Sequence, residues 1–342
     1  MKLAKEKRYR YYIGIDVSKN ELDFAVFDNH KLLFHEERKN EYADIVEFVK
    51  SIKNLPNLTF GNILFVMEYT GIYCNPLLKA LRSVKTNFAQ VNALEIRNSS
   101  GIIRGKYDKI DAIRIGRFAV KHHSTIKLWQ DRRPIIEQLS NLCSLRNRLI
   151  DTQTAIKKPI NEQLIFAKEG IHQQTVLSCE NTLTAIAADL KKVNKNIVEL
   201  IRSDERLCRL HTLILSVPSV GPVTSIQIIL STNEFLTISD PKKFACYAGV
   251  VPFHKESGKN IGKGRVSKFA NKKIKALLHM CAITAVRKQG ELKDFFIRKT
   301  EIEGKHKMSV YNSIRNKLVL RIFACVHEDR MYQETYQPKI AI

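Results

Sequence analysis

The stretch Tyr11–Asp28, YYIGIDVSKNELDFAVFD, decides the fold of the first part of the chain. Two runs rich in apolar residues, YYIGIDV and LDFAVFD, are joined by SKNE, whose residues favour turns. The pattern predicts two strands of one hairpin. An acid, Asp16, lies where the first strand would meet its turn. Residues at strand ends line the crevice in which open α/β sheets bind ligands, so this carboxylate is a candidate for a functional site.

Strand-like and helix-like patterns alternate from this hairpin to about residue 123. KLLFHEER is typical of a third strand of the same meander, and EYADIVEFVKSI has apolar residues at helical spacing. NILFVME is typical of a strand buried on both faces. A helix over residues 75–82, a strand at NFAQV and a helix over KYDKIDAIRIGRFAVKHH are predicted to follow. This order predicts an α/β domain with a mixed sheet over residues 1–125.

The middle of the chain, residues 126–208, has the apolar spacing of a coiled coil. Six apolar residues recur at intervals of 3, 4, 3, 4 and 3: Leu183, Ile186, Leu190, Val193, Ile197 and Leu200. This is the 3.5-residue period of a coiled-coil seam. A less regular series runs from Ile135 to Leu149, and Pro159 is predicted to break the helix between the two. The two helices would pair as an antiparallel hairpin within one chain or with a second chain.

The last section, residues 209–342, is predicted to be a small, mainly helical domain. LILSVPSVGPVTSIQIIL indicates two apolar helices joined by a turn around Pro218 and Gly221. Such a helix–hairpin–helix can offer backbone N–H groups to a phosphate, although similar turns are common elsewhere. Ten Lys or Arg residues and one acid, Glu256, lie between Lys242 and Lys275. The excess positive charge is therefore concentrated in this section.

The overall charge favours a polyanionic partner. The chain has 57 Lys and Arg residues against 34 Asp and Glu residues, a formal net charge of +23. Each cation placed on a phosphate releases condensed counterions, so nucleic acid is the leading class of partner and an anionic membrane a distant second. No run of 18 apolar residues and no apolar signal region is present, so we expect no membrane insertion. Seven scattered cysteines indicate reduced thiols in a cytoplasmic protein.

Four acids from separate segments are candidates for one site. Asp16 and Glu68 each end a predicted strand, and Asp108 and Asp111 are three residues apart on a predicted helix. Clustered carboxylates repel one another, and hard divalent cations such as Mg²⁺ or Mn²⁺ relieve that repulsion. Taken singly, an Asp at a strand end is more often a turn residue, and a DxxD pair is usually a solvated face. Three neighbouring acids compete for the same role: Asp23, Asp28 and Glu95.

Three of these segments together resemble a known family. YIGIDVSKNELDFAVFD, VMEYTGIY and KYDKIDAIRIGRFA are similar to the three sequence blocks of the DEDD transposases of bacterial insertion sequences, the Piv-like group of bridge-RNA-guided serine recombinases. The resemblance implies that residues 1–125 form a RuvC-like, ribonuclease-H-type domain. It also implies that Asp16, Glu68, Asp108 and Asp111 are the metal-binding and catalytic acids.

The resemblance extends to the basic loop HKESGKNIGKGRVSK of the C-terminal section. It implies that Ser257, the serine before the first glycine of this loop, is the nucleophile that attacks DNA. Ser267 is the alternative nucleophile, although we interpret it as the N-cap of the next helix. Lys and Arg side chains around the loop are predicted to hold phosphates: Lys259, Lys263, Arg265, Lys268, Lys272 and Lys273.

The resulting hypothesis is a recombinase that moves an insertion sequence, with the acids holding metal ions and Ser257 attacking the scissile phosphate. Its expected partners are DNA, a bridge guide RNA and further copies of the same chain in a dimer or tetramer joined through the coiled coil. We expect it in the bacterial cytoplasm, associated with the nucleoid. Two alternatives remain: a junction resolvase that needs only the acids, and a non-catalytic nucleic-acid-binding scaffold.

Overall fold

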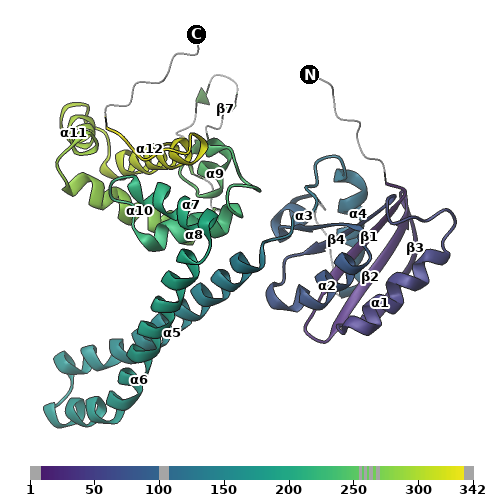
Figure 1. Cartoon of the computed structure of the whole chain (residues 1–342), viewed down its shortest axis with the longest axis horizontal. Coiled ribbons are helices and arrows are strands. Elements are labelled where there is room, and N and C mark those ends of the chain that lie inside the picture. The colour runs from purple at the N-terminus through teal and green to yellow at the C-terminus, as the bar shows by residue number, and fades with distance from the viewer. Residues whose placement is uncertain are drawn as a thin grey trace. The chain divides into compact units, whose positions relative to one another are not determined.

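A computed structural model describes residues 9–99, 108–253, 256–257, 260–261, 265–266 and 270–334 of the chain (Figure 1). The chain divides into two compact units, Met1–Asp131 and Arg132–Ile342. The further division of the second unit at residue 208, into a helical region and a C-terminal domain, stays a prediction.

The first unit is built on a five-stranded sheet in the order β3-β2-β1-β4-β5. Its strands are β1 (Tyr11–Val17), β2 (Glu21–Asp28), β3 (Lys31–Lys39), β4 (Ile63–Glu68) and β5 (Asn87–Val91). The first three form an antiparallel meander, whereas β4 runs parallel to β1 and β5 runs parallel to β4. The predicted meander and mixed sheet are confirmed, and the α/β fold is that expected of a RuvC-like domain.

Helices cover both faces of this sheet. They are α1 (Tyr42–Ser51), α2 (Asn75–Ser83), α3 (Ala93–Ser99) and α4 (Asp108–His122), with short 3₁₀ turns η1 (Ile52–Asn54) and η2 (Gly71–Cys74). Side chains alternate between the two faces along a strand. Odd-numbered residues of β1 and β4 pack with α1 and α2, and even-numbered residues pack with α3 and α4. Two separate cores result, one on each side of the sheet.

A close contact between two glycines holds α4 against β1. A Cβ atom on Gly14 of β1 would overlap the backbone of Gly116 and of Ala112 in α4. A Cβ atom on Gly116 would in turn overlap the ring of Phe27. Backbone can approach backbone this closely only where side chains are absent. The two glycines therefore fix both the distance and the position of α4 along the strand.

Replacing Gly14 by Ala is expected to lower the free energy of unfolding by about 3 kcal/mol, because the new methyl group would force α4 away from the sheet. Replacing Gly61 by Ala is the matched control, because a Cβ atom there would meet nothing nearer than the Thr59 hydroxyl at 3.8 Å. Urea unfolding of both variants measures the difference. Equal stability of the two variants would contradict the proposed role of the glycine contact.

The second unit begins with a pair of long antiparallel helices, α5 (Pro134–Phe166) and α6 (Glu169–Arg202), which lie side by side (Figure 1). Between Leu183 and Leu200, the six residues of the predicted α6 seam are the buried and half-buried positions, and the residues between them are exposed. The hairpin within one chain is thus confirmed, and its base joins the core of the helices that follow. Assembly with a second chain through this region stays a prediction.

The prediction that Pro159 breaks the helix is wrong. Pro159 lies within α5, which continues to Phe166 before a short connection leads into α6. Proline removes one helical hydrogen bond and normally kinks or ends a helix. Here the next residue, Ile160, is buried, so packing of α5 outweighs the local preference.

Shorter helices form the rest of the second unit. They are α7 (Glu205–Ser216), α8 (Pro222–Thr232), α9 (Pro241–Tyr247), α10 (Lys272–Arg287), α11 (Glu291–Ile297), the π-helical turn η3 (Arg298–Ile302) and α12 (Lys307–His327). Two-residue strands form two ladders: β6 (Pro252–Phe253) with β9 (Arg265–Val266), and β7 (Glu256–Ser257) with β8 (Asn260–Ile261). The mainly helical character and the two helices around Pro218 and Gly221 are confirmed. Among the described residues, no helix has the length and apolar character needed to cross a bilayer.

Candidate functional site

Asp16 and Glu68 lie at the same end of two neighbouring parallel strands. The register of β1 and β4 pairs Ile15 with Met67, and the two acids are the next residues along each strand. Both are even-numbered, so they face the same side of the sheet as Val66, which packs in the core under α4. The sheet therefore brings together two acids that are 52 positions apart in the sequence, as counted from residues 16 and 68.

The direction of α4 brings its first turn to the same edge. Ala112 and Gly116 contact β1 at Gly14, and the ring of His123, just beyond α4, lies 5.7 Å from that of Tyr12. The helix consequently runs antiparallel to β1, and its N-terminal end lies toward the end of the strand. Asp108 and Asp111 belong to that N-terminal end.

Burial and a neighbouring carboxylate both raise the pKa of Glu68. The pKa of Glu68 is raised above its usual range, first by burial and second by the charge of Asp111. The two acids are therefore close enough to repel each other, as their placement on β4 and α4 suggests. Oxygen donors that repel one another at the edge of a sheet suit a hard divalent cation. The donor chemistry of this edge fits such an ion.

Two further contacts hold the acids in place. An Asp16 carboxylate oxygen accepts a hydrogen bond from the backbone N–H of Val17 at 3.1 Å. Arg114, one turn along α4, forms an ion pair with Asp111. Sequence reasoning missed Arg114, although its i,i+3 spacing from Asp111 was the available signal. This arginine would offset part of the negative charge of the site.

The described residues do not include all four side chains of the predicted metal site. The side chain of Asp108 lies outside them, and no group of three described His, Cys, Asp or Glu side chains is arranged to hold a metal. The assignment of Asp16, Glu68, Asp108 and Asp111 as metal ligands therefore stays a prediction. It is supported by the shared edge, the shared face and the interaction of Glu68 with Asp111.

The competing acids have other partners or positions. Asp23 lies directly across from Asp16 in the β1–β2 register, and its carboxylate is 2.6 Å from Nε2 of His35 on β3. Asp28 forms an ion pair with Arg10 at 2.9 Å, and Glu95 is exposed on α3. Asp23 and His35 thus extend the polar row beside Asp16, and nothing in the local sequence indicated this pairing.

The serine loop belongs to the second unit. Ser257 lies in β7 and pairs with Asn260 of the antiparallel strand β8. The side chain of Ser257 lies outside the described residues, as do the side chain of Arg265 and the whole of Lys259, Lys263, Ser267 and Lys268. The predicted roles of these residues stay predictions.

The helix after the serine loop has a different cap from the predicted one. The N-cap of α10 is Asn271, whose side-chain oxygen accepts a hydrogen bond from the N–H of Ile274 at 3.0 Å. The interpretation of Ser267 as this cap is therefore wrong, because the observed N-cap, Asn271, lies four residues after it. Lys272 and Lys273 are exposed in the first turn of α10, as a phosphate-binding role requires.

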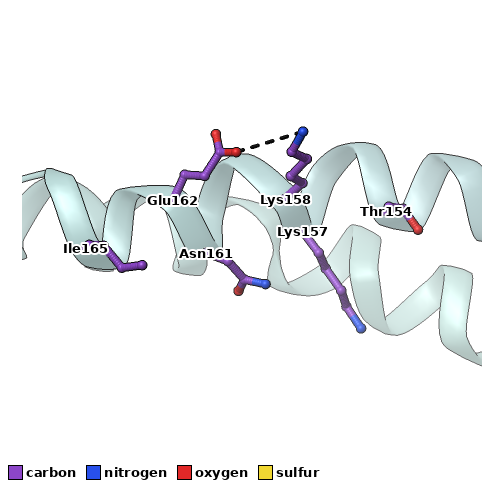
Figure 2. A pocket seen from close by; sticks show the side chains of 6 residues that line it. All are labelled: Thr154, Lys157, Lys158, Asn161, Glu162 and Ile165. Atoms are coloured by element: carbon purple, nitrogen blue, oxygen red, sulfur yellow. Dashed lines mark ion pairs between the residues drawn. The ribbon is translucent and has the colours of Figure 1, made fainter. Parts of the chain in front are cut away.

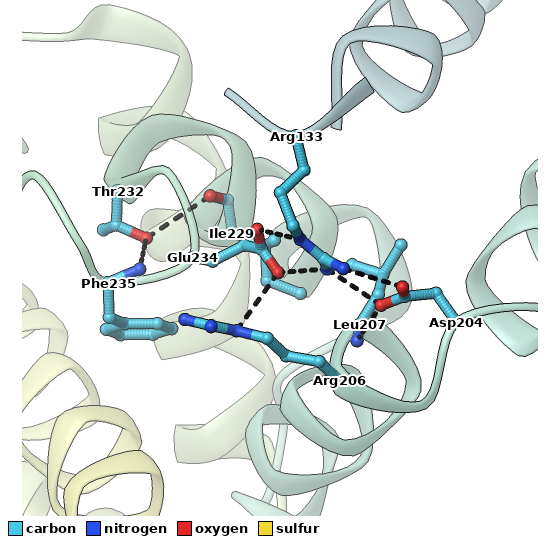
Figure 3. Close-up of polar contacts among 8 residues, drawn as sticks. All are labelled: Arg133, Asp204, Arg206, Leu207, Ile229, Thr232, Glu234 and Phe235. Carbon is cyan, nitrogen blue, oxygen red and sulfur yellow. Dashed lines mark hydrogen bonds and ion pairs between the residues drawn. The ribbon is translucent and has the colours of Figure 1, made fainter. Parts of the chain in front are cut away.

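A network of charges joins three segments at the base of the helical pair (Figure 3). Arg133, just before α5, donates to Asp204 at 2.7 and 2.8 Å and to Glu234 at 2.9 Å. The Glu234 side chain is fully buried, and Arg206 approaches it to 3.4 Å. These contacts raise the pKa of Arg133 and lower that of Asp204. The network fastens the start of α5 to the start of α7 and to the turn after α8.

Replacing Arg133 by Met is expected to lower the free energy of unfolding by about 3 kcal/mol, because Glu234 loses its main partner while remaining buried. The loss of unfolding free energy caused by Arg133→Met should be smaller at low pH than at neutral pH. The pKa of Asp204 is depressed in the folded state, so its stabilising contribution is present above its unfolded pKa and is lost as the carboxylate is protonated.

Urea unfolding at neutral pH and at about pH 3 measures both effects of the Arg133 change. Replacing the adjacent, exposed Arg132 by Met is the control, because it removes the same charge from outside the network. A pH-independent loss, or an equal loss in the control, would contradict the proposed role of the network.

A shallow depression lies on α5 (Figure 2). It has a volume of about 390 Å³ and is lined by Thr154, Lys157, Lys158, Asn161, Glu162 and Ile165. Its ion pair, Lys158 with Glu162, spans 4.0 Å between exposed side chains. Such surface pairs contribute little to stability, and none of the described residues that line the depression is a candidate catalytic residue.

Two protein families match the chain. Residues 13–167 match the DEDD transposase family of IS110 elements, described as "Transposase", and residues 211–296 match the "Transposase IS116/IS110/IS902 family". The first match contains all four predicted acids. The second match contains the serine loop.

Individual proteins are also similar to this chain. The chain is 24% identical over 327 residues to the "Pilin gene-inverting protein" of Moraxella bovis, covering 94% of this chain and 98% of the relative. It is 24% identical over 191 residues to the "Insertion element IS116 uncharacterized 44.8 kDa protein" of Streptomyces clavuligerus, covering 55% and 47%. The solved "Thermus thermophilus RuvC structure" is 12% identical with a TM-score of 0.28, covering 35% of this chain and 99% of that one.

Proposed function

The chain belongs to the DEDD-type transposases of insertion sequences and is a DNA recombinase, and on this premise we propose that it cuts and rejoins DNA through a serine nucleophile. The observation that carries the proposal is the shared edge of the first unit. Asp16 and Glu68 lie at the same end of two adjacent parallel strands under α4, whose N-terminal end carries Asp108 and Asp111. The pKa of Glu68 is raised first by burial and second by the charge of Asp111, which supports a close approach of these two acids.

These four acids would hold Mg²⁺ or Mn²⁺, which when bound supplies positive charge against the scissile phosphate. Ser257 is the proposed nucleophile. Its Oγ forms a bond to phosphorus while the bond from phosphorus to the departing DNA oxygen breaks. The serine loses its proton, and the departing oxygen becomes a free hydroxyl. The phosphoserine intermediate retains the energy of the broken bond for rejoining to a second strand.

The first unit carries the acids and the second carries the serine, so the proposed reaction needs both units. Exchange of strands requires more than one serine, and we propose an assembly of several copies of the chain. A guide RNA that pairs with donor and target DNA is part of the same proposal. The formal net charge of +23 would suit two polyanionic partners.

The proposal is tested by incubating the protein with DNA from an element end, the RNA encoded beside it and Mg²⁺. The expected product is protein joined covalently to DNA through the serine at position 257, identified by mass spectrometry of the linked peptide. Strand exchange without any covalent adduct would overturn the serine mechanism and leave the metal-dependent nuclease as the better interpretation.

A further inference from the structure

A cavity in the second unit lies where five helices meet, and Lys273 is the one residue that it shares with the cations predicted around the serine loop. It has a volume of about 330 Å³ and takes side chains from α5, α6, α7, α8 and α10. Ile197, Ile201 and Ile226 form an apolar part of its wall, and all three are largely buried. Asn147 and Gln227, which carry amide side chains, also line the cavity.

The charged groups of this cavity are all cationic. Among the described residues, its ionised side chains are Arg146 and Lys273, and no carboxylate lines it. Nε of Arg146 donates to Oδ1 of Asn194 at 2.7 Å, which holds the guanidinium at the wall. Within the described part of the chain, neither cation forms an ion pair with an acid. Positive charge is therefore available to an anionic ligand.

The thiol of Cys143 lies close to both cations of the cavity. Burial raises the pKa of this thiol, and the charges of Lys273 and Arg146 oppose that rise. The two cations come from α10 and α5, so both helices direct charge toward the same thiol. The positive end of α8 adds to this field, since Pro222 and Val223 of its first turn also line the cavity.

We propose that this cavity binds one unpaired nucleotide of a single-stranded nucleic acid. The flat face of a base suits the isoleucine wall, its polar edge suits the amides of Asn147 and Gln227, and Arg146 and Lys273 suit the adjoining phosphate. A base within a duplex keeps both its stacking and its pairing partners and is not free to enter. The cavity thus favours single strands over duplexes.

This inference rests on the proposed function only in requiring that the protein binds nucleic acid.

Replacing Arg146 by Gln tests whether the cavity binds a nucleotide, with Arg148→Gln as the matched control. Arg148 lies on the same helix, is exposed and does not line the cavity. The probes are a labelled single-stranded RNA, DNA of the same sequence and the corresponding DNA duplex. The full-length protein is titrated by fluorescence anisotropy at several salt concentrations.

Arg146→Gln is expected to weaken single-strand binding about tenfold and to reduce the salt dependence by about 0.7 in the logarithmic slope. Binding of the duplex should change by less than about twofold, and Arg148→Gln should behave as wild type on all three probes. The affinities for RNA and DNA single strands show which of them is the preferred source of the nucleotide.

The thiol of Cys143 gives an independent measurement. A bound single strand should protect Cys143 from alkylation in the wild-type protein, as followed by peptide mass spectrometry. Equal affinities of wild type and Arg146→Gln, an equal loss on duplex DNA, or no protection of Cys143 would each overturn this inference alone. Failure of the wild-type protein to bind any of the probes would overturn the proposed function as well.

Discussion

Replacing Glu68 by Gln is expected to reduce DNA strand exchange at least about a hundredfold while nucleic-acid binding stays within about twofold of wild type. Gln keeps the size of the side chain but removes the charge that a divalent cation requires. Glu68 is half-buried and close to Asp111. It is the single acid of β4, so that strand has no second carboxylate to replace it. Strand exchange is measured on a gel in the presence of Mg²⁺, and binding by fluorescence anisotropy on the same DNA.

Two further measurements separate a metal-binding role of Glu68 from a structural one. Mg²⁺ should raise the melting temperature of the wild-type protein but not that of the Glu68→Gln variant, because a ligand stabilises only the state that binds it. The same replacement at Glu95, an exposed acid of the same unit, should leave both activity and the Mg²⁺ effect unchanged. Full strand exchange by Glu68→Gln would contradict a catalytic role for Glu68.

Local patterns in the sequence were sufficient to predict the sheet and the place of its acids. Alternating and continuous apolar runs identified the strands, and a carboxylate at the end of a buried run is an unusual residue in that position. The shared face of Asp16 and Glu68 follows from the register of β1 and β4, which the sequence does not specify. That register depends on packing against α4, where Gly14 and Gly116 meet.

Contacts between distant segments account for what the sequence could not provide. Arg133 and Glu234 are 101 positions apart, and neither has a neighbour that indicates the pairing. Asp23 and His35 lie on adjacent strands, but their contact depends on a register with a bulge after Val26. The continuation of α5 through Pro159 has the same cause, because tertiary packing outweighs a local preference.

Replacing Ser257 by Ala is expected to abolish the covalent adduct between protein and DNA and to lower strand exchange by at least about a thousandfold. The methyl side chain cannot form a bond to phosphorus, whereas the strand pairing of Ser257 with Asn260 uses backbone groups and should persist. Binding of DNA and the melting temperature should therefore stay close to wild type. The adduct is detected as a slowly migrating band that disappears on protease treatment.

Replacing Ser267 by Ala provides the comparison, because it removes the other hydroxyl of the same basic loop. Since Asn271, and not Ser267, caps α10, this replacement should leave the helix and the reaction intact. Loss of the adduct in Ser267→Ala with full activity in Ser257→Ala would reassign the nucleophile. Continued Mg²⁺-dependent cutting by Ser257→Ala would instead favour a junction resolvase, because its carboxylates activate water and need no serine.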